Sequence, residues 1–149
     1  SGTFLQLSSG QNHNCAIGLT GLVECWGNNS SGQSNPPSAV FDRVSTGNEF
    51  SCGITSAGEV QCWGYDSQGQ ATAPSGTFTE ISAGYYHACA IEDVGTVVCW
   101  GSNGSGQCSA PSGLFAQLSS GQLHACGIQL SGSVECWGND AYGQSSPPP

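Results

Sequence analysis

Short segments in which apolar and polar side chains alternate recur along the whole chain, and no segment has the period of a helix. In the first unit the predicted strands are residues 4–8, 13–17 and 22–26, with a glycine-bounded turn between the last two. A polar loop then follows, and Pro36 and Pro37 close the unit. This pattern predicts three short antiparallel strands joined by tight turns.

The same pattern returns every 37 residues, and the four units cover residues 1–37, 38–74, 75–111 and 112–148. A fixed period of this length is typical of repeat architectures, in which each unit is one supersecondary element. We therefore predict an all-β chain in which residues 1–149 form one β-propeller domain of four antiparallel blades. Four blades close a small ring alone, or supply half of an eight-bladed ring that is shared between chains.

Eight of the nine cysteines form one pair per unit at a constant spacing. The pairs are Cys15 with Cys25, Cys52 with Cys62, Cys89 with Cys99, and Cys126 with Cys136. A repeated pair in a small domain indicates disulfides and an oxidising compartment. Zinc is the competing explanation, but this spacing is unusual for zinc ligands and no second pair completes a tetrahedral set. Each disulfide contributes roughly 3 kcal/mol in the chain-entropy model.

The cysteine spacing also predicts the register of the hairpin. If Cys15 faces Cys25, then Ile17 faces Val23, and an apolar pair lies beside the cysteine pair in every unit. One tryptophan per unit projects from the opposite face and is predicted to pack between blades: Trp26, Trp63, Trp100 and Trp137. The small residues expected to lie beside these rings on the partner strand are Ala16, Gly53, Ala90 and Gly127. Exposed platforms for sugar stacking are the alternative role of the tryptophans.

The formal net charge is −9, and Arg43 is the single Lys or Arg. Nucleic acids and anionic membranes need clustered cations, so neither is expected as a partner. No apolar stretch approaches the length needed to insert into a bilayer. The chain does not start with Met, which is compatible with a removed leader. Together with the cysteine pairs, these features predict an acidic, secreted, extracellular protein.

Residues 84–91 (Gly-Tyr-Tyr-His-Ala-Cys-Ala-Ile) and 97–107 (Val-Val-Cys-Trp-Gly-Ser-Asn-Gly-Ser-Gly-Gln) carry the fullest copy of the repeat. This motif resembles the repeat of the regulator of chromosome condensation and β-lactamase-inhibitor protein II families. Its paired cysteines are similar to those of Crinkly-type plant receptor ectodomains. The resemblance implies a β-propeller, although those families build seven-bladed rings and Phe50 replaces the histidine in the second unit. Fold resemblance alone does not assign a function.

The residue types that carry catalysis are present without a catalytic arrangement. His13, His87 and His124 share one repeat position, which indicates a scaffold role, and the carboxylates are dispersed. We therefore expect no enzyme activity, no catalytic residues and no cofactor. One loop position carries an Asn or Asp in each unit: Asn29, Asp66, Asn103 and Asp140. Turn formation explains these side chains better than calcium binding does, so no metal is expected.

Departures from the repeat are the candidate contact residues. Large side chains replace polar loop residues at five positions: Tyr65, Tyr85, Tyr86, Leu123 and Tyr142. Asn28, Asn29 and Asn103 lie in Asn-x-Ser sequons and are candidate glycosylation sites. Cys108 has no partner in its unit, so it is either a candidate intermolecular thiol or a buried, inert one.

Two roles follow from these observations. The first is a self-assembling extracellular structural subunit, a homo-oligomer or filament whose main partners are copies of itself. The alternative is a soluble recognition propeller that binds a protein or glycan through its loops. The unpaired Cys108 and the absence of an atypical terminal repeat favour the first role.

Overall fold

The computed structural model describes residues 2–148, and this part of the chain contains twelve strands and no helix. Ser1, where the first repeat was predicted to begin, and Pro149 lie outside the described residues. The strands form four separate antiparallel sheets, one per repeat, in the order inner, middle and outer strand. The all-β propeller architecture is therefore confirmed at the level of the blades.

Each blade contains three consecutive strands. Blade 1 contains β1 (Phe4–Ser9), β2 (His13–Gly18) and β3 (Val23–Gly27). Blade 2 contains β4 (Phe41–Thr46), β5 (Phe50–Thr55) and β6 (Val60–Gly64). Blade 3 contains β7 (Phe78–Ala83), β8 (His87–Glu92) and β9 (Val97–Gly101). Blade 4 contains β10 (Phe115–Ser120), β11 (His124–Gln129) and β12 (Val134–Gly138).

The predicted hairpin register is present in every blade. Cys15 lies opposite Cys25 and Ile17 lies opposite Val23, and the three other blades repeat both pairs. All four predicted cysteine pairs are disulfides within a blade, so each bond joins the middle strand to the outer strand of one sheet. The four bonds link Cys15 to Cys25, Cys52 to Cys62, Cys89 to Cys99, and Cys126 to Cys136.

The small residues predicted to lie beside the tryptophans are elsewhere, and this part of the register prediction was wrong. Trp26 lies opposite Asn14, whereas Ala16 lies opposite Glu24. The same shift applies to Gly53, Ala90 and Gly127. A Cβ at Gly53 would lie 2.6 Å from the ring of Phe41, so this position is small because the inner-strand phenylalanine lies against it.

A bulge in each inner strand decides which side chains face the neighbouring blade. The register shifts between Phe41 and Arg43, so Phe41 and Val44 are both buried although they are three positions apart in the chain. The other inner strands contain the same shift. Blades 2, 3 and 4 therefore each present a phenylalanine and an aliphatic side chain to the preceding blade.

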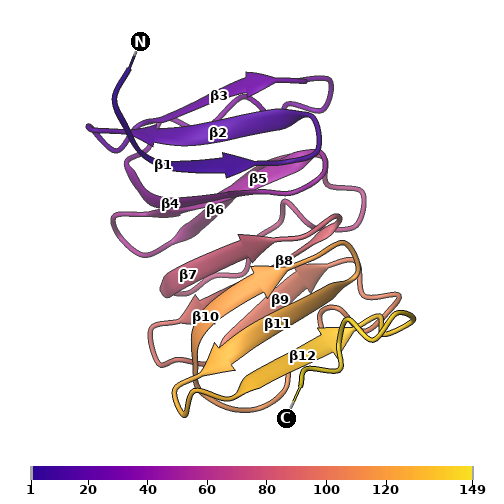
Figure 1. Cartoon of the computed structure of the whole chain (residues 1–149). Coiled ribbons are helices and arrows are strands. Elements are labelled where there is room, and N and C mark those ends of the chain that lie inside the picture. The colour runs from indigo at the N-terminus through magenta and orange to yellow at the C-terminus, as the bar shows by residue number, and fades with distance from the viewer. Residues whose placement is uncertain (1, 149) are drawn as a thin grey trace.

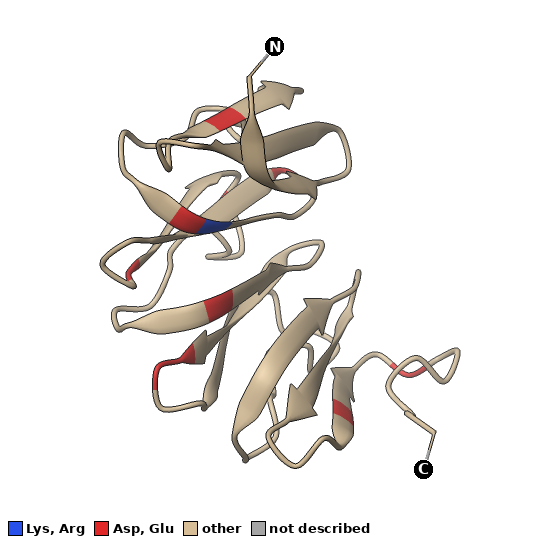
Figure 2. Cartoon of the chain, turned by 60° about the vertical axis from the view of Figure 1, so that its left-hand side comes forward, with Lys and Arg blue, Asp and Glu red and all other residues tan. Residues whose placement is uncertain are grey.

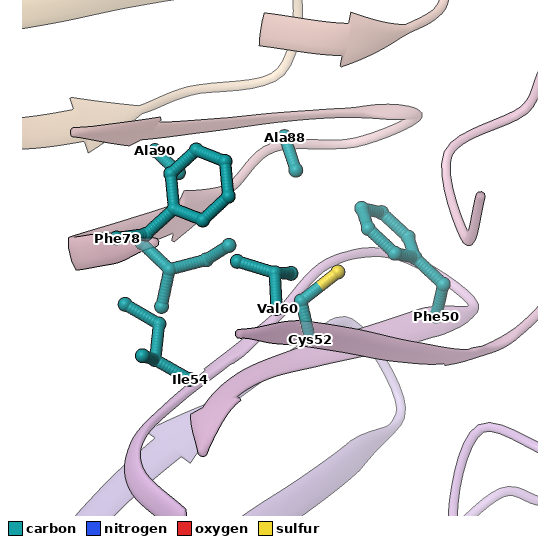
Figure 3. Packing of buried hydrophobic residues seen from close by; sticks show 8 residues of the cluster. Phe50, Cys52, Ile54, Val60, Phe78, Ala88 and Ala90 are labelled. Carbon is teal, nitrogen blue, oxygen red and sulfur yellow. The ribbon is translucent and has the colours of Figure 1, made fainter. Parts of the chain in front are cut away.

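Three apolar clusters join the blades in chain order. In the cluster of Figure 3, Ile54 and Val60 of blade 2 pack against Phe78 of blade 3. Phe41 and Trp63 of blade 2 are packed in the same way on blade 1. The third cluster joins blades 3 and 4. Hence the core of the molecule lies between sheets, and each blade depends on its neighbours for burial.

The four blades follow one another in an open arc, and the two termini lie at opposite ends of it (Figure 1). Blade 1 contacts blade 2 through β1, β2 and β4, and blade 3 contacts blade 4 through β7, β8 and β10. The outward faces of blades 1 and 4 remain exposed, as the side chains described below show. Residues 2–148 therefore form an arc of four blades rather than a closed ring.

Candidate interaction surfaces

The outward face of blade 1 exposes the side chains that the other blades bury against a preceding blade. Phe4, Leu7 and Trp26 are 39%, 60% and 47% exposed. At the same repeat positions, Phe41 and Val44 of blade 2 are 1% and 2% exposed. This face, defined by Phe4, Leu7 and Trp26, is called the N-face below. It is an apolar contact surface without a partner among residues 2–148.

The outward face of blade 4 exposes side chains that the other blades bury beneath the following blade. Ile128 and Val134 are 38% and 46% exposed, whereas Ile54 and Val60, at the same repeat positions in blade 2, are 3% and 9% exposed. A groove of about 110 Å³ lies beside them and is lined by Leu118. A second hollow of about 380 Å³ lies between the ends of β11 and β12. We call this grooved surface of blade 4 the C-face.

Polar bonds cross each covered interface at fixed repeat positions. The indole nitrogen of Trp63 donates to the carbonyl oxygen of Gln33 in the preceding blade at 2.9 Å, and Trp100 and Trp137 donate to Gln70 and Gln107 in the same way. Near the axis, the backbone N–H of Thr46 donates to the hydroxyl of Ser8 at 3.0 Å. These hydrogen bonds are directional, so they fix both the orientation of adjacent blades and the spacing between them.

Three of the five predicted contact residues lie together. The ring centroids of Tyr85 and Tyr86 are 4.6 Å apart, and those of Tyr65 and Tyr86 are 6.0 Å apart, across blades 2 and 3. Leu123 and Tyr142 lie apart from this cluster, on blade 4, where both line the larger hollow of the C-face. Tyr142 is almost fully exposed.

A wide hollow lies on the axial side of the arc. It has a volume of about 380 Å³ and is lined by the loops that follow the inner strands, including Tyr85. Glycines at one repeat position line this hollow. A larger residue does not fit there, because a Cβ at Gly47 would collide with the ring of Phe50 and lie 2.5 Å from the carbonyl oxygen of Gly84. The backbone of consecutive blades therefore stacks closely around the axis.

The three histidines share one repeat position but have unequal surroundings. His13 is buried, and its Nε2 lies 2.8 Å from the hydroxyl of Ser51 in blade 2. His87 is also buried, but neither of its ring nitrogens has a hydrogen-bond partner. Burial, followed by the nearby His124, lowers the pKa of His87 from 6.5 to about 4. The rings of His13 and His87 pack between blades, whereas His124 lines the larger hollow of the C-face.

Cys108 takes the place of a serine in the loop after β9. Its thiol donates to the carbonyl oxygen of Ser102 at 3.2 Å, as the hydroxyl of Ser34 donates to Asn28 in blade 1. Burial raises the pKa of Cys108 to about 11, so little reactive thiolate exists at neutral pH. The surroundings are those of a thiol that stabilises its own loop.

The Asn and Asp side chains of the outer loops bind the backbone of those loops. Asp66 accepts from the backbone N–H of Ala71 and from the hydroxyl of Thr72, both at 2.7 Å. Asn29 and Asn103, which are sequon residues, make the equivalent backbone bond. Asn28, the third sequon residue, accepts from Ser30. No cluster of metal-ligating side chains occurs among residues 2–148.

Charge does not define a site on this molecule. Figure 2 shows the positions of the acidic residues scattered over the blades, and Arg43, on β4, is the single Lys or Arg of the sequence. Within the described residues, no helix is long and apolar enough to cross a bilayer. Apolar side chains, rather than charged ones, therefore define the N-face and the C-face.

Sequence reasoning singled out Trp26 but missed the other residues that define these faces. Phe4, Leu7, Ile128 and Val134 repeat the pattern of buried residues in other units, so nothing in their own segments marks them as exposed. The interface positions of the first and last units are apolar like those of the other units, and among residues 2–148 no further blade covers them.

Comparison with known proteins places the fold among propellers. The profile of the "Regulator of chromosome condensation (RCC1) repeat" matches residues 4–33, 41–70 and 78–107. These three stretches make up more than half of the chain, and each begins at an inner-strand phenylalanine and ends at the buried glutamine of the outer loop. A comparison with curated protein sequences finds no match.

Two receptor ectodomains are similar in both structure and sequence. The ectodomain of the Physcomitrella patens receptor kinase CR4 is 34% identical with a TM-score of 0.79, and 91% of this chain covers 40% of it. The CRINKLY ectodomain of the Arabidopsis thaliana receptor kinase ACR4 is 28% identical with a TM-score of 0.79, and 93% of this chain covers 56% of it. This chain thus spans only about half of either structure or less.

Yeast RCC1 (Prp20), solved bound to Kap60, shares the fold. It is 15% identical with a TM-score of 0.81, and 93% of this chain covers 44% of it. At this identity the similarity concerns the blades alone.

Proposed function

Since this chain belongs to the family of RCC1 repeat proteins, we propose that it is an extracellular, disulfide-linked propeller module that assembles with copies of itself. The proposed role is structural, as a subunit of a homo-oligomer or filament, and residues 1–149 act in it as one propeller domain. We assign no catalytic activity and no cofactor to this module.

The observation that carries the proposal is the exposure of two complementary apolar faces. Leu7 on the N-face and Val134 on the C-face are both about half-exposed or more, whereas Val44 and Val60, at the same repeat positions in blade 2, are buried. Fully burying such a side chain stabilises by roughly 1.5–3 kcal/mol. Each face would therefore gain free energy from covering by a partner blade.

An extracellular location is supported by the disulfides and by the relatives. Every blade contains a disulfide, and such bonds persist in oxidising compartments. The two similar plant structures are both receptor ectodomains. The acidic net charge opposes association at long range, and salt at physiological concentration screens this repulsion.

Recognition of another protein is the second candidate function, and the tyrosine cluster supports it. Tyr65, Tyr85 and Tyr86 form an aromatic surface across two blades, of the kind enriched in protein contacts. Protein binding has precedent in the fold, because yeast RCC1 was solved with Kap60.

The test is the mass of the purified 149-residue chain in solution. Sedimentation and native mass spectrometry over a concentration series should show dimers or larger species, and their fraction should increase when salt is raised from low to physiological concentration. Reduction-resistant association is expected, because the proposal uses no disulfide through Cys108. A chain that stays monomeric up to about 100 µM at physiological salt contradicts self-assembly, since weaker association is close to non-specific contact.

A further inference from the structure

We propose that the tyrosine cluster, formed by Tyr65 of blade 2 and by Tyr85 and Tyr86 of blade 3, binds an arginine side chain of a partner protein. This inference rests on the second candidate function above and gives the chemistry of its partner. Blades 2 and 3 are covered on both sides within residues 2–148, so the cluster lies in a complete part of the arc.

The three rings form one aromatic surface across the two blades. The planes of Tyr85 and Tyr86 meet at 77° with centroids 4.6 Å apart, and Tyr65 is inclined to Tyr86 by 48° at 6.0 Å. Tyr65 is exposed, and the other two rings are half-buried. The face of an aromatic ring attracts a cation within about 6 Å of its centroid. Inclined rings at these distances therefore offer a cation more than one attractive face.

Tyr65 replaces a side chain that stabilises its own loop in other blades. At this repeat position, Asn28 accepts from the backbone N–H of Ser30 at 3.0 Å. Asn139 accepts in the same way from Ala141 at 3.1 Å. A tyrosine ring has no oxygen placed to make this short-range bond, so blade 2 has an exposed ring where these loops have a hydrogen bond. Such an exchange favours binding over folding as the role of Tyr65.

A carboxylate belongs to the same surface. The backbone carbonyl of Glu49 accepts from the N–H of Tyr65 at 2.8 Å. Burial raises the pKa of Tyr86 above 10.0, Tyr85 raises it further, and the charge of Glu49 also contributes, which places this carboxylate near the ring. The sequence has ten Asp and Glu but only one Lys or Arg. A cation that meets Glu49 and the rings therefore comes most readily from another molecule.

Asn48 adds an unpaired acceptor beside the rings. Its backbone N–H donates to the carbonyl oxygen of Tyr85 at 3.3 Å, and both residues line the axial hollow. Asn48 is 6% exposed, and its side-chain oxygen has no hydrogen-bond donor among residues 2–148. The partial charge of this oxygen has the same sign as the charge of Glu49 and as the ring faces. The complementary partner is therefore positive.

An arginine side chain fits this surface better than other groups do. Its planar guanidinium stacks on ring faces, and it is more weakly hydrated than an ammonium group, so its transfer to a half-buried surface costs less. Its apolar stem can cover the exposed ring of Tyr65. An acidic segment would be repelled by Glu49, and an apolar one would remove this carboxylate from water without compensation.

Two peptides with blocked ends test the sign of the charge. The first has the sequence Gly-Ser-Arg-Gly-Ser-Arg-Gly, and in the second citrulline, the neutral isostere, replaces both arginines. Nuclear magnetic resonance follows binding to the 149-residue chain through the ring signals of the three tyrosines. The arginine peptide should shift these signals saturably and bind at least about fivefold more tightly than the citrulline peptide.

Substitutions copied from another repeat test the site. Tyr65→Asn introduces the residue that blade 1 has as Asn28. Tyr86→Asn likewise copies Asn12, so both loops should fold, and circular dichroism verifies this. Each variant should bind the arginine peptide about threefold or more weakly, because a π face is lost. Tyr86→Phe keeps the ring and should bind within about twofold of the parent chain.

A matched pair of acidic substitutions separates a local charge from the net charge. Glu49→Gln should weaken binding of the arginine peptide about twofold or more at low salt. Glu24→Gln, on the outer strand of blade 1, changes the net charge equally and should leave binding unchanged. Equal weakening by both, together with unchanged binding by Tyr65→Asn and Tyr86→Asn, would show non-specific attraction to an acidic chain and overturn the proposed site.

The remaining outcomes separate this inference from the proposed functions. Equal affinity for the two peptides overturns the preference for arginine, but protein recognition at the cluster stands if Tyr86→Asn then weakens both. Absence of saturable binding of the arginine peptide up to about 5 mM also overturns the inference. Self-association is measured separately, by the mass of the chain in solution, and Tyr86→Asn should not change it.

Discussion

The interface between blades 1 and 2 and the interface between blades 3 and 4 have the same apolar contacts but different polar ones. In the first, Ser51 bridges His13 and the carbonyl oxygen of Gln33, at 2.8 and 3.1 Å. In the second, His87 has the place of His13, but Ala125 replaces the serine. Both nitrogens of His87 are therefore buried without a partner.

The difference shows which contacts hold the arc together. A buried, unpaired polar group costs about 1–3 kcal/mol, yet blade 4 still packs on blade 3 as blade 2 packs on blade 1. The remaining covered interface has Phe50 at this position and needs no hydrogen bond there. Apolar burial thus sets the position of the blades, and the histidine position only modulates the strength of each interface.

The largest predicted effect concerns the shared apolar contacts. Phe41→Ala and Phe115→Ala should each lower the free energy of unfolding by about 4 kcal/mol, because each removes a buried ring from an interface. Urea unfolding measured at low concentration checks both values. Phe4→Ala, at the same repeat position but on the N-face, is the control and should cost about 1 kcal/mol or less. Values for Phe41 and Phe115 that differ by more than about 2 kcal/mol contradict equal apolar contributions.

The second prediction is a loss of stability in acid, which arises from His87 at the interface between blades 3 and 4. The pKa of His87 is about 4 in the folded chain and 6.5 in the unfolded one, so between these values the unfolded chain binds more protons. Stability is therefore lost as the pH falls from 6.5 towards 4, by about 3 kcal/mol from this residue. Urea midpoints at pH 7 and pH 4.5 measure the loss.

The matched control for the acid prediction is His87→Phe, which copies Phe50 of blade 2. This variant should be at least as stable as the parent chain at pH 7 and should lose less stability at pH 4.5. Some pH dependence remains, because burial also lowers the pKa of His13. Identical pH profiles for the parent chain and the variant would show that His87 does not cause the loss.

The smallest predicted effects come from exchanging the polar residue between the two interfaces. Ser51→Ala should cost about 2 kcal/mol, because it leaves Nε2 of His13 unpaired, as His87 is now. Ala125→Ser should contribute about 1 kcal/mol by supplying the missing hydroxyl beside His87. Unfolding at pH 7 measures both, and the same sign for the two substitutions would refute the comparison.

The local structure of each blade follows from the sequence, because it depends on short-range pairing. The spacing of Cys15 and Cys25 predicts the hairpin register, and the period of 37 residues predicts four identical sheets. The partner of Trp26 was misassigned, although the same register implies Asn14. The bulge after Phe41 was not predictable, because no local pattern distinguishes it from regular pairing.

The relation between blades was harder to predict. Whether Leu7 or Ile128 is covered depends on which blade lies beside it, and the side chains are apolar in either case. Similarly, His13 and His87 share a motif, and only the residue opposite in the next blade decides whether the ring has a partner. Long-range contacts, rather than the repeat itself, therefore decide the candidate site.

The disulfide within each blade has a mechanical consequence. It ties together two residues that are 10 positions apart, so the hairpin turn between them cannot be extended when the chain is pulled from its ends. Each disulfide prevents about ten residues, or roughly 33 Å of contour length, from extending when the blade is stretched. Under oxidising conditions tension can separate the blades and release their outer loops, while the middle and outer strands stay joined. A chain under load would thus extend in short, limited steps and retain a hairpin in every blade, from which the sheet can form again.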